Sequence, residues 1–260
     1  MYGFFLVAEF YQATGVKISE FTEKRLNNMG VSIIKRTLLL LCLTLLVSIN
    51  QAIADCNDRR SPGMDWSGCK KTNKMLDDTN FSGSRFDGAN LSMSTLHGSN
   101  FTGASLVKAD MTRSPATRTH FKDADLTKAV GYRANFDEAR FKNTTLIKSE
   151  FSRASLKKAT LEDVDWSRSE LGRADFSGAS LKNVNFEFSN LSRAMFTDSK
   201  LSNVDFKGAY TYLTHFENID LTGVLNLTQA QIDISCGNLN TRVPKGRWIP
   251  DTWPCSDWLD

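Results

Sequence analysis

Five arginines recur in this sequence at intervals of 20 residues. They are Arg113, Arg133, Arg153, Arg173 and Arg193. A guanidinium group carries forked N–H donors that match the oxygens of a phosphate or a carboxylate. The residues two positions further along are mainly uncharged, and only Asp175 among them is acidic. This spacing predicts an arginine ladder that binds an anionic ligand. The alternative is that the arginines are simply solvated, with stems that cover apolar surface.

A second basic series precedes the first by five residues. It comprises Lys108, Lys128, Lys148 and Arg168. Like charges that are stacked at strand spacing repel one another unless opposite charges compensate. Asp110, Glu150 and Glu170 follow three of these four residues by two positions. We therefore expect the second series to form a ladder of ion pairs with no further role.

The residue types needed for catalysis are sparse. His97, His120 and His215 do not cluster, and all three occupy positions that we expect to face solvent. No Ser–His–Asp relay can be assembled from them. Asp and Asn alternate at equivalent positions, which argues against general acid–base roles for the carboxylates. The sequence has no glycine-rich phosphate loop, and we predict no enzymatic activity, no cofactor and no metal site.

The elements that position these side chains follow a period of five residues. Every fifth residue from Leu76 to Leu221 is large and apolar, except Ala116, Gly131 and Thr211, where we expect local bulges or a notch. We call the large residue of each pentad its centre; a small residue lies two positions before it. This period fits neither an α-helix nor a plain strand. It predicts a solenoid that turns a corner every five residues, with the centre and the small residue facing inward.

The pentads also match a known motif. The units Ala89-Asn-Leu-Ser-Met, Ala124-Asp-Leu-Thr-Lys, Ala134-Asn-Phe-Asp-Glu and Ala174-Asp-Phe-Ser-Gly have the form A-(D/N)-(L/F)-x-x. In this respect the sequence resembles the pentapeptide repeat proteins. The resemblance implies an all-β fold, a right-handed quadrilateral β-helix with one pentad per side and four per coil. It implies about 7.5 coils for residues 76–225, stacked at strand spacing.

The first 54 residues have the pattern of an export signal. Residues 37–49 are uncharged, Lys35 and Arg36 precede them, and the small-residue site Ala52-Ile53-Ala54 follows. The run is short for a membrane-spanning helix, so we predict a signal peptide that is cleaved after Ala54. An uncleaved anchor is the alternative. A start at Met29 would give a signal peptide of ordinary length, which leaves open whether residues 1–28 are translated.

Four cysteines remain after the predicted cleavage, and an even number is typical of disulfides in exported chains. Cys56 and Cys69 precede the repeats, whereas Cys236 and Cys255 follow them. Of the three possible connectivities, we expect the local one, which joins Cys56 to Cys69 and Cys236 to Cys255.

Each end of the solenoid needs a cap over its apolar core. We assign the N-terminal cap to residues 55–75 and the C-terminal cap to residues 226–260. Thr228-Gln-Ala-Gln231 has the capping-box pattern, which predicts a short helix. Trp248, Trp253 and Trp258 follow, and we expect them to cover the last coil. An aromatic platform for a sugar or a partner is the alternative.

Composition narrows the function without naming it. The chain has 260 residues, of which 23% are charged, and its net charge is only +3. This balance does not indicate nucleic-acid binding. We predict a periplasmic or secreted, monomeric scaffold that has no membrane span after cleavage and binds an unknown protein or an envelope polyanion. A secreted effector is one alternative. The other is implied by the resemblance: a DNA mimic that binds a topoisomerase, which the leader, cysteines and basic residues disfavour.

Overall fold

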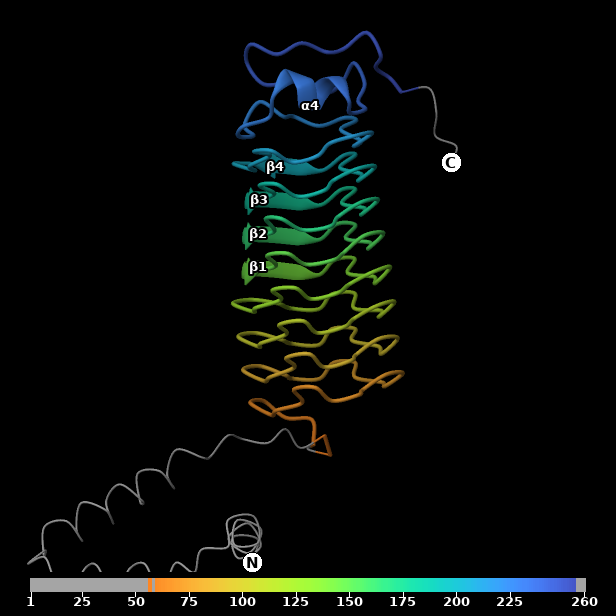
Figure 1. Cartoon of the computed structure of the whole chain (residues 1–260), viewed down its shortest axis with the longest axis vertical. Coiled ribbons are helices and arrows are strands. Elements are labelled where there is room, and N and C mark those ends of the chain that lie inside the picture. Colours follow the sequence, from red (N-terminus) through yellow and green to blue (C-terminus); the bar gives the residue numbers. More distant parts are fainter. Residues whose placement is uncertain (1–55, 58, 256–260) are drawn as a thin grey trace, which may run out of the picture. The chain divides into compact units, whose positions relative to one another are not determined.

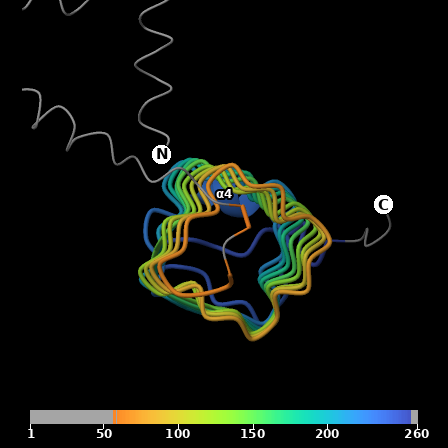
Figure 2. The ribbon, with the colours of Figure 1, turned by 90° about the horizontal axis from the view of Figure 1, so that it is seen from below.

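A computed structural model describes residues 56–57 and 59–255 of the chain (Figure 1). The backbone of this part winds into stacked coils, and parallel bridges join residues 20 positions apart. Viewed along the stack, successive coils superimpose around one closed outline (Figure 2). The fold is the right-handed four-sided β-helix that the repeats predicted. The predicted signal peptide in residues 1–54 and Trp258 lie outside the described residues.

Backbone hydrogen bonds hold each coil to the next. The N–H of a centre donates to a carbonyl of the following coil, as Leu76 does to Thr95 at 2.9 Å and Phe81 does to Asn100 at 2.8 Å. The N–H of the corner residue two positions later does the same, as Asp78 does to His97 at 2.7 Å. Both bonds repeat along the stack, and they fix the register at one coil per 20 residues.

The core is a column of centres and small residues. The centres from Leu76 to Phe196 are buried, and so are the alanines and serines two positions before them. Phenylalanine rings stack from coil to coil; Phe101, Phe121 and Phe141 lie with ring centroids 5.4 and 4.9 Å apart. Buried apolar area is therefore spread evenly over the coils, and each coil is stabilised mainly by its two neighbours.

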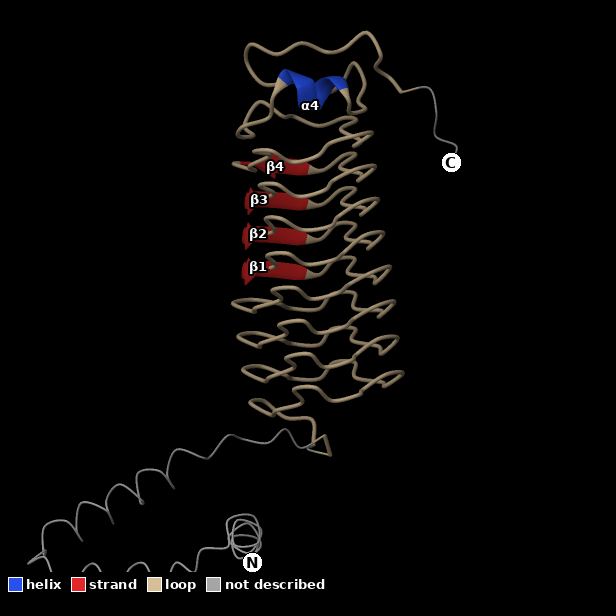
Figure 3. Cartoon of the chain, viewed as in Figure 1, coloured by secondary structure: helices blue, strands red, loops and turns tan. Residues whose placement is uncertain are grey.

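Four strands and one short helix are regular enough to be named (Figure 3). The strands are β1 (Arg140–Thr145), β2 (Thr160–Asp165), β3 (Ser180–Asn185) and β4 (Lys200–Ser202), and the helix is α4 (Gln229–Asp233). The strands pair in parallel in the order β1-β2-β3-β4, one strand per coil. Across this corner the amide of Asn183 donates to Asp163 at 2.7 Å, and that of Asn203 donates to Asn183 at 2.8 Å.

Two expectations about the regularity of the coils need correction. The bridges begin at Asp65, which pairs with Arg85, so the first coil lies within residues 55–75 that we assigned to a cap. The expected bulges are also absent from the described coils, because the bridges continue unbroken past Gly131 and Ala116. At Gly131 the ring of Phe151 occupies the space that a side chain would fill.

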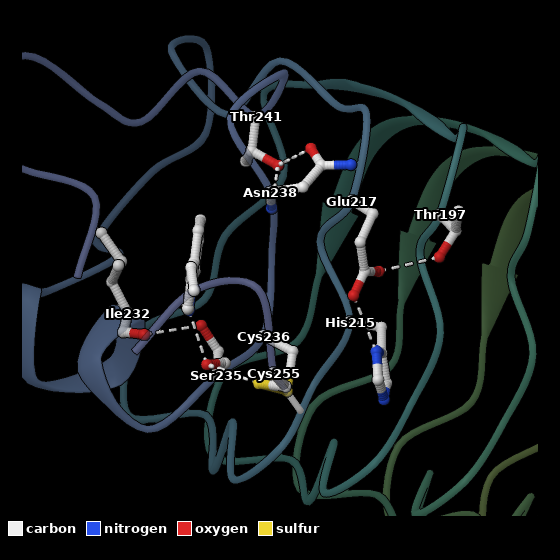
Figure 4. The surroundings of a disulfide bond; sticks show 10 residues. Thr197, His215, Glu217, Ile232, Ser235, Cys236, Asn238, Thr241 and Cys255 are labelled. Atoms are coloured by element: carbon white, nitrogen blue, oxygen red, sulfur yellow. Dashed lines mark hydrogen bonds and ion pairs between the residues drawn. A yellow bond between two sulfur atoms is a disulfide. The ribbon is translucent and has the colours of Figure 1, made fainter. Parts of the chain in front are cut away.

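The C-terminal cap has the predicted helix and disulfide. Thr228 caps α4 reciprocally with Gln231, and Cys236 is bonded to Cys255 (Figure 4). The chain then rejoins the stack, because Cys236 pairs with His215. Trp253 is buried and its indole N–H donates to the carbonyl of Ser235 at 2.7 Å, so this tryptophan does cover the end.

At the opposite end, Cys56 is bonded to Cys69, again as predicted. Trp248 differs from Trp253 in being 62% exposed. Within residues 56–255, no helix has the length and apolar character needed to span a bilayer.

Candidate functional site

The five arginines of the ladder occupy one corner of five successive coils. Each lies two residues after a centre, and each has a positive φ, between 56° and 61°. The backbone N–H of Arg113 donates to the carbonyl of Tyr132, and that of Arg133 donates to the carbonyl of Ser152. The same bond repeats at the other three arginines. The arginines therefore stack at the spacing of the coils, about 4.8 Å.

The arginine ladder has no charge partner within the described part of the chain. Arg113, Arg133 and Arg153 are exposed, and the other two members are half-buried. None of the five makes an ion pair with a described residue. Asp175, the one acidic residue two positions after a ladder member, pairs instead with Lys157 at 3.1 Å. Five guanidinium groups thus lie in a row with their donors available to a ligand.

The second basic series does not form the ion pairs that we expected from its sequence neighbours. Among the described residues, no carboxylate lies within ion-pair distance of Lys108, Lys128, Lys148 or Arg168. An inward-facing residue separates each cation from the acid two positions later, so the corner lies between them. Asp110 accepts from the backbone N–H of Thr112 at 2.8 Å, and Glu170 accepts from the amide of Asn190 at 2.8 Å. This correction leaves two basic columns on adjacent corners.

Ion pairs form at a different position of the pentad, directly after the centre. Glu162 accepts from Lys142 at 2.9 Å and from Lys182 at 3.2 Å, one coil below and one coil above. Hydrogen bonds from these two ammonium groups hold the pKa of Glu162 below its usual value. Lys207 and Glu187 make the same kind of pair at 2.6 Å. Charge compensation in this fold therefore runs along a column, between residues 20 apart.

One histidine is less exposed than the repeat pattern suggested. The side chain of His215 is only 14% exposed, and its Nδ1 lies 2.8 Å from a carboxylate oxygen of Glu217 (Figure 4). Thr197 donates to the other oxygen of Glu217 at 3.0 Å. Burial raises the pKa of Glu217, but the hydrogen bonds from His215, its own backbone and Thr197 outweigh burial, and the pKa lies below its usual value.

This cluster does not have the order of a nucleophilic relay. The hydroxyl of Thr197 bonds to the carboxylate, whereas a relay needs a hydroxyl on the imidazole. The sequence contained the signal for the cluster, because Thr197 and Glu217 are 20 residues apart and His215 flanks the same centre. No group of three potential metal ligands occurs among residues 56–57 and 59–255.

Comparison with known families agrees with the geometry. The profile described as pentapeptide repeats (8 copies) matches residues 76–113, and the profile described as pentapeptide repeat region matches residues 132–196. The sequence matches none of the curated proteins. The two matched stretches include four of the five members of the arginine ladder and part of the second basic column.

Two solved structures illustrate the similarity. QnrB1, a plasmid-mediated fluoroquinolone resistance protein, is 16% identical, with 71% of this chain and 91% of that chain covered and a TM-score of 0.49. HetL, a pentapeptide repeat protein involved in heterocyst differentiation regulation from the cyanobacterium Nostoc, is 21% identical. That comparison covers 86% of this chain and 98% of HetL, with a TM-score of 0.34.

Proposed function

This chain belongs to the pentapeptide repeat family, and from that premise we propose that it is an exported, non-enzymatic scaffold that binds an anionic partner. The binding surface is the arginine ladder, Arg113 to Arg193. The partner is an envelope polyanion or the acidic surface of a protein. The proposal rests above all on one observation: five stacked guanidinium groups have no ion pair with any described residue.

The energetics of the ladder support a binding role. Stacked like charges repel one another, and compensation by a ligand would remove that cost. The donors of an arginine fork also match the paired oxygens of phosphate and carboxylate groups. Elsewhere in the same fold the charged columns are compensated, as in the column of Lys142, Glu162 and Lys182. The ladder is therefore a local exception to the way in which this solenoid arranges its charges.

The cysteines support a location outside the cytoplasm. Both local disulfides have one partner at the outermost coil of its end, and such bonds persist in oxidising compartments. The predicted leader in residues 1–54 points to the same location. A secreted effector shares all these features, and recovery of the protein from culture medium would favour it over a periplasmic scaffold. A DNA mimic needs an acidic surface, and two adjacent basic columns do not favour that role.

The test is a binding measurement with a matched charge reversal. We expect the oxidised protein to bind anionic glycolipid, anionic phospholipid vesicles or acidic polypeptides, with an affinity that falls as salt screens the charges. The variant Arg133→Glu/Arg153→Glu/Arg173→Glu is expected to bind at least about 100-fold more weakly, since it replaces three charge-assisted contacts with repulsion.

The control changes the net charge equally on the neighbouring corner. Lys108→Glu/Lys128→Glu/Lys148→Glu is expected to retain most of the binding, because those residues lie outside the ladder. Equal loss in both triple variants would show that net charge, and not the ladder, attracts the ligand. Unchanged binding in the arginine variant would reject the ladder as the site.

A further inference from the structure

A second basic feature lies at the N-terminal end of the stack, apart from the arginine ladder. A hollow of about 470 Å³ is lined there by Arg59, Arg60, Trp66, Lys71, Lys74 and Leu76. Its volume is in the range of small-ligand sites in proteins. Four of the six lining residues are cations, and none is acidic. The lining thus combines a strongly positive field with one indole ring.

The register of the repeats explains why this composition is unusual. Trp66, Lys71 and Leu76 are three successive centres, and Lys74 occupies the small inward position before Leu76. The first coil therefore has lysines at two positions that are apolar or small in the later coils. Trp66 packs on Phe81 and Phe86 with centroids 5.9 Å away in each case, so it ends the apolar core. The lysines begin a polar layer directly above it.

The indole of Trp66 carries a donor without a partner. The residue is 3% exposed, and its Nε1 makes no hydrogen bond within the described part of the chain. A buried N–H normally has a partner, because leaving it unpaired costs free energy. The ammonium of Lys71 lies 3.7 Å from the centroid of the same ring and donates to the carbonyl of Cys56. The ring is therefore held in place while its own donor remains available.

The remaining cations of the hollow have no ion pair either. Arg59, Arg60 and Lys74 are exposed, and none lies within ion-pair distance of a carboxylate among the described residues. The nearest described ion pair of this end, Arg85 with Asp65, involves no lining residue. We propose that the hollow binds a small phosphate-bearing ligand, whose oxygens accept from the two guanidinium groups, Lys74 and the indole N–H. Several cations without an acid favour a dianion over a single carboxylate.

The proposal is tested by NMR of the protein purified after expression of its full-length gene, with the N-terminus established by mass spectrometry. The probe is inorganic phosphate, added at constant ionic strength against sodium chloride, and Trp66→Phe assigns the indole resonance. We expect a saturable shift of the Trp66 Nε1–H signal. Arg59→Gln/Arg60→Gln is expected to weaken binding by about tenfold or more, since charged hydrogen bonds are lost.

A matched control separates this site from the proposed function. Arg113→Gln/Arg133→Gln removes the same charge from the ladder and is expected to leave the phosphate titration unchanged. Lys74→Gln is a second variant within the hollow and is also expected to weaken binding. Phosphate binding is thus tested independently of the polyanion binding assigned to the ladder.

Three results would overturn the proposal. The first is the absence of a saturable shift, and the second is an equal shift with acetate or chloride. The third is phosphate binding that occurs only in Asp55→Asn/Asp58→Asn, which would identify carboxylates of the chain itself as the occupants. Retention of full affinity in both the double arginine variant and Lys74→Gln would likewise exclude these cations as the ligands of phosphate.

Discussion

At the scale of single residues, the corner position two after each centre is the most constrained. Its φ is positive at glycines such as Gly83 and Gly178, and also at Arg153 and Asn143. A residue with a side chain pays a conformational cost in this region, which glycine avoids. Arginine at five successive corners therefore combines a backbone cost with electrostatic repulsion. Neither cost has a compensating contact in the ladder itself, which is consistent with a role in binding.

The pair formed by His215 and Glu217 predicts a defined pH dependence of stability. The pKa of Glu217 is lowered in the folded protein, so its contribution to stability is present above the unfolded pKa and is lost as pH falls through the folded pKa. We expect the melting temperature to fall below about pH 4.3, where an unfolded glutamate begins to protonate. The variant Glu217→Gln should show a smaller fall, as measured by thermal unfolding between pH 6 and pH 2.5.

The exposed Glu138 provides the control, because it makes no ion pair with a described residue. Glu138→Gln should follow the pH profile of the unmodified protein. Identical profiles for all three proteins would mean that the contacts of Glu217 contribute nothing measurable to stability.

At the scale of the pentad, the small inward residue has two chemical forms. Alanine fills the space between centres, whereas serine and threonine also satisfy a backbone group. The hydroxyl of Ser114 donates to the carbonyl of Leu91 at 2.8 Å, and that of Thr214 donates to the carbonyl of Leu191 at 2.8 Å. Buried hydroxyls are tolerated at this position because the previous coil supplies an acceptor. Valine lacks the hydroxyl and packs only through its methyl groups, as at Val184.

The exception at Gly131 predicts a packing coupling between neighbouring coils. A Cβ on Gly131 would come within 2.7 Å of the ring of Phe151, and that ring is held from other sides by Phe136 and Trp166. Gly131→Ala should therefore destabilise the protein by about 1–3 kcal/mol through overpacking. Urea unfolding measures the change. In a Phe151→Leu background the same substitution should cost much less, because the smaller side chain leaves room.

Gly223 is the matched control for this prediction. Its φ is not positive and nothing lies within 4 Å of an added Cβ, so Gly223→Ala should be close to neutral. An equal cost for Gly131→Ala in both backgrounds would contradict the packing coupling.

At the scale of the whole described stack, stability is a sum over neighbouring coils, and the ends are the weakest parts. Each end is tied by one disulfide, Cys56 to Cys69 and Cys236 to Cys255. Interior coils have a neighbour on both sides, whereas the first and last coils have only one. The caps therefore restrict fraying, which would otherwise begin at an end and propagate.

Removal of the C-terminal disulfide should loosen that end first. The bond closes a sequence separation of 19 residues, so Cys236→Ala/Cys255→Ala should lower stability by about 3 kcal/mol. Hydrogen exchange followed by mass spectrometry should show faster exchange around α4 and Thr241, with the coils near Trp166 unchanged. Cys56→Ala/Cys69→Ala should produce the same effect at the opposite end. A uniform acceleration along the stack in either variant would show that the protein unfolds as one unit.

The period of five residues determined most of this architecture without reference to the structure. It set the inward positions, the 20-residue coil and the arrangement of the arginines in one column, because the same local pattern recurs with no insertion between Leu76 and Leu221. The pairing of the cysteines also followed from their positions on either side of the repeats. The sequence likewise predicted the short helix, since a capping box is a local signal.

Only the tertiary structure decided which side chains contact one another across the coils. The acids after Lys108 and Lys148 are near in sequence, but a corner separates them, and ion pairs form between residues 20 apart. The pairing of His215 with Glu217 and the filling of Gly131 by Phe151 depend on directions that side chains take after stacking. The hollow beside Trp66 likewise arises where the stack ends, because the last apolar layer meets lysines at inward positions there.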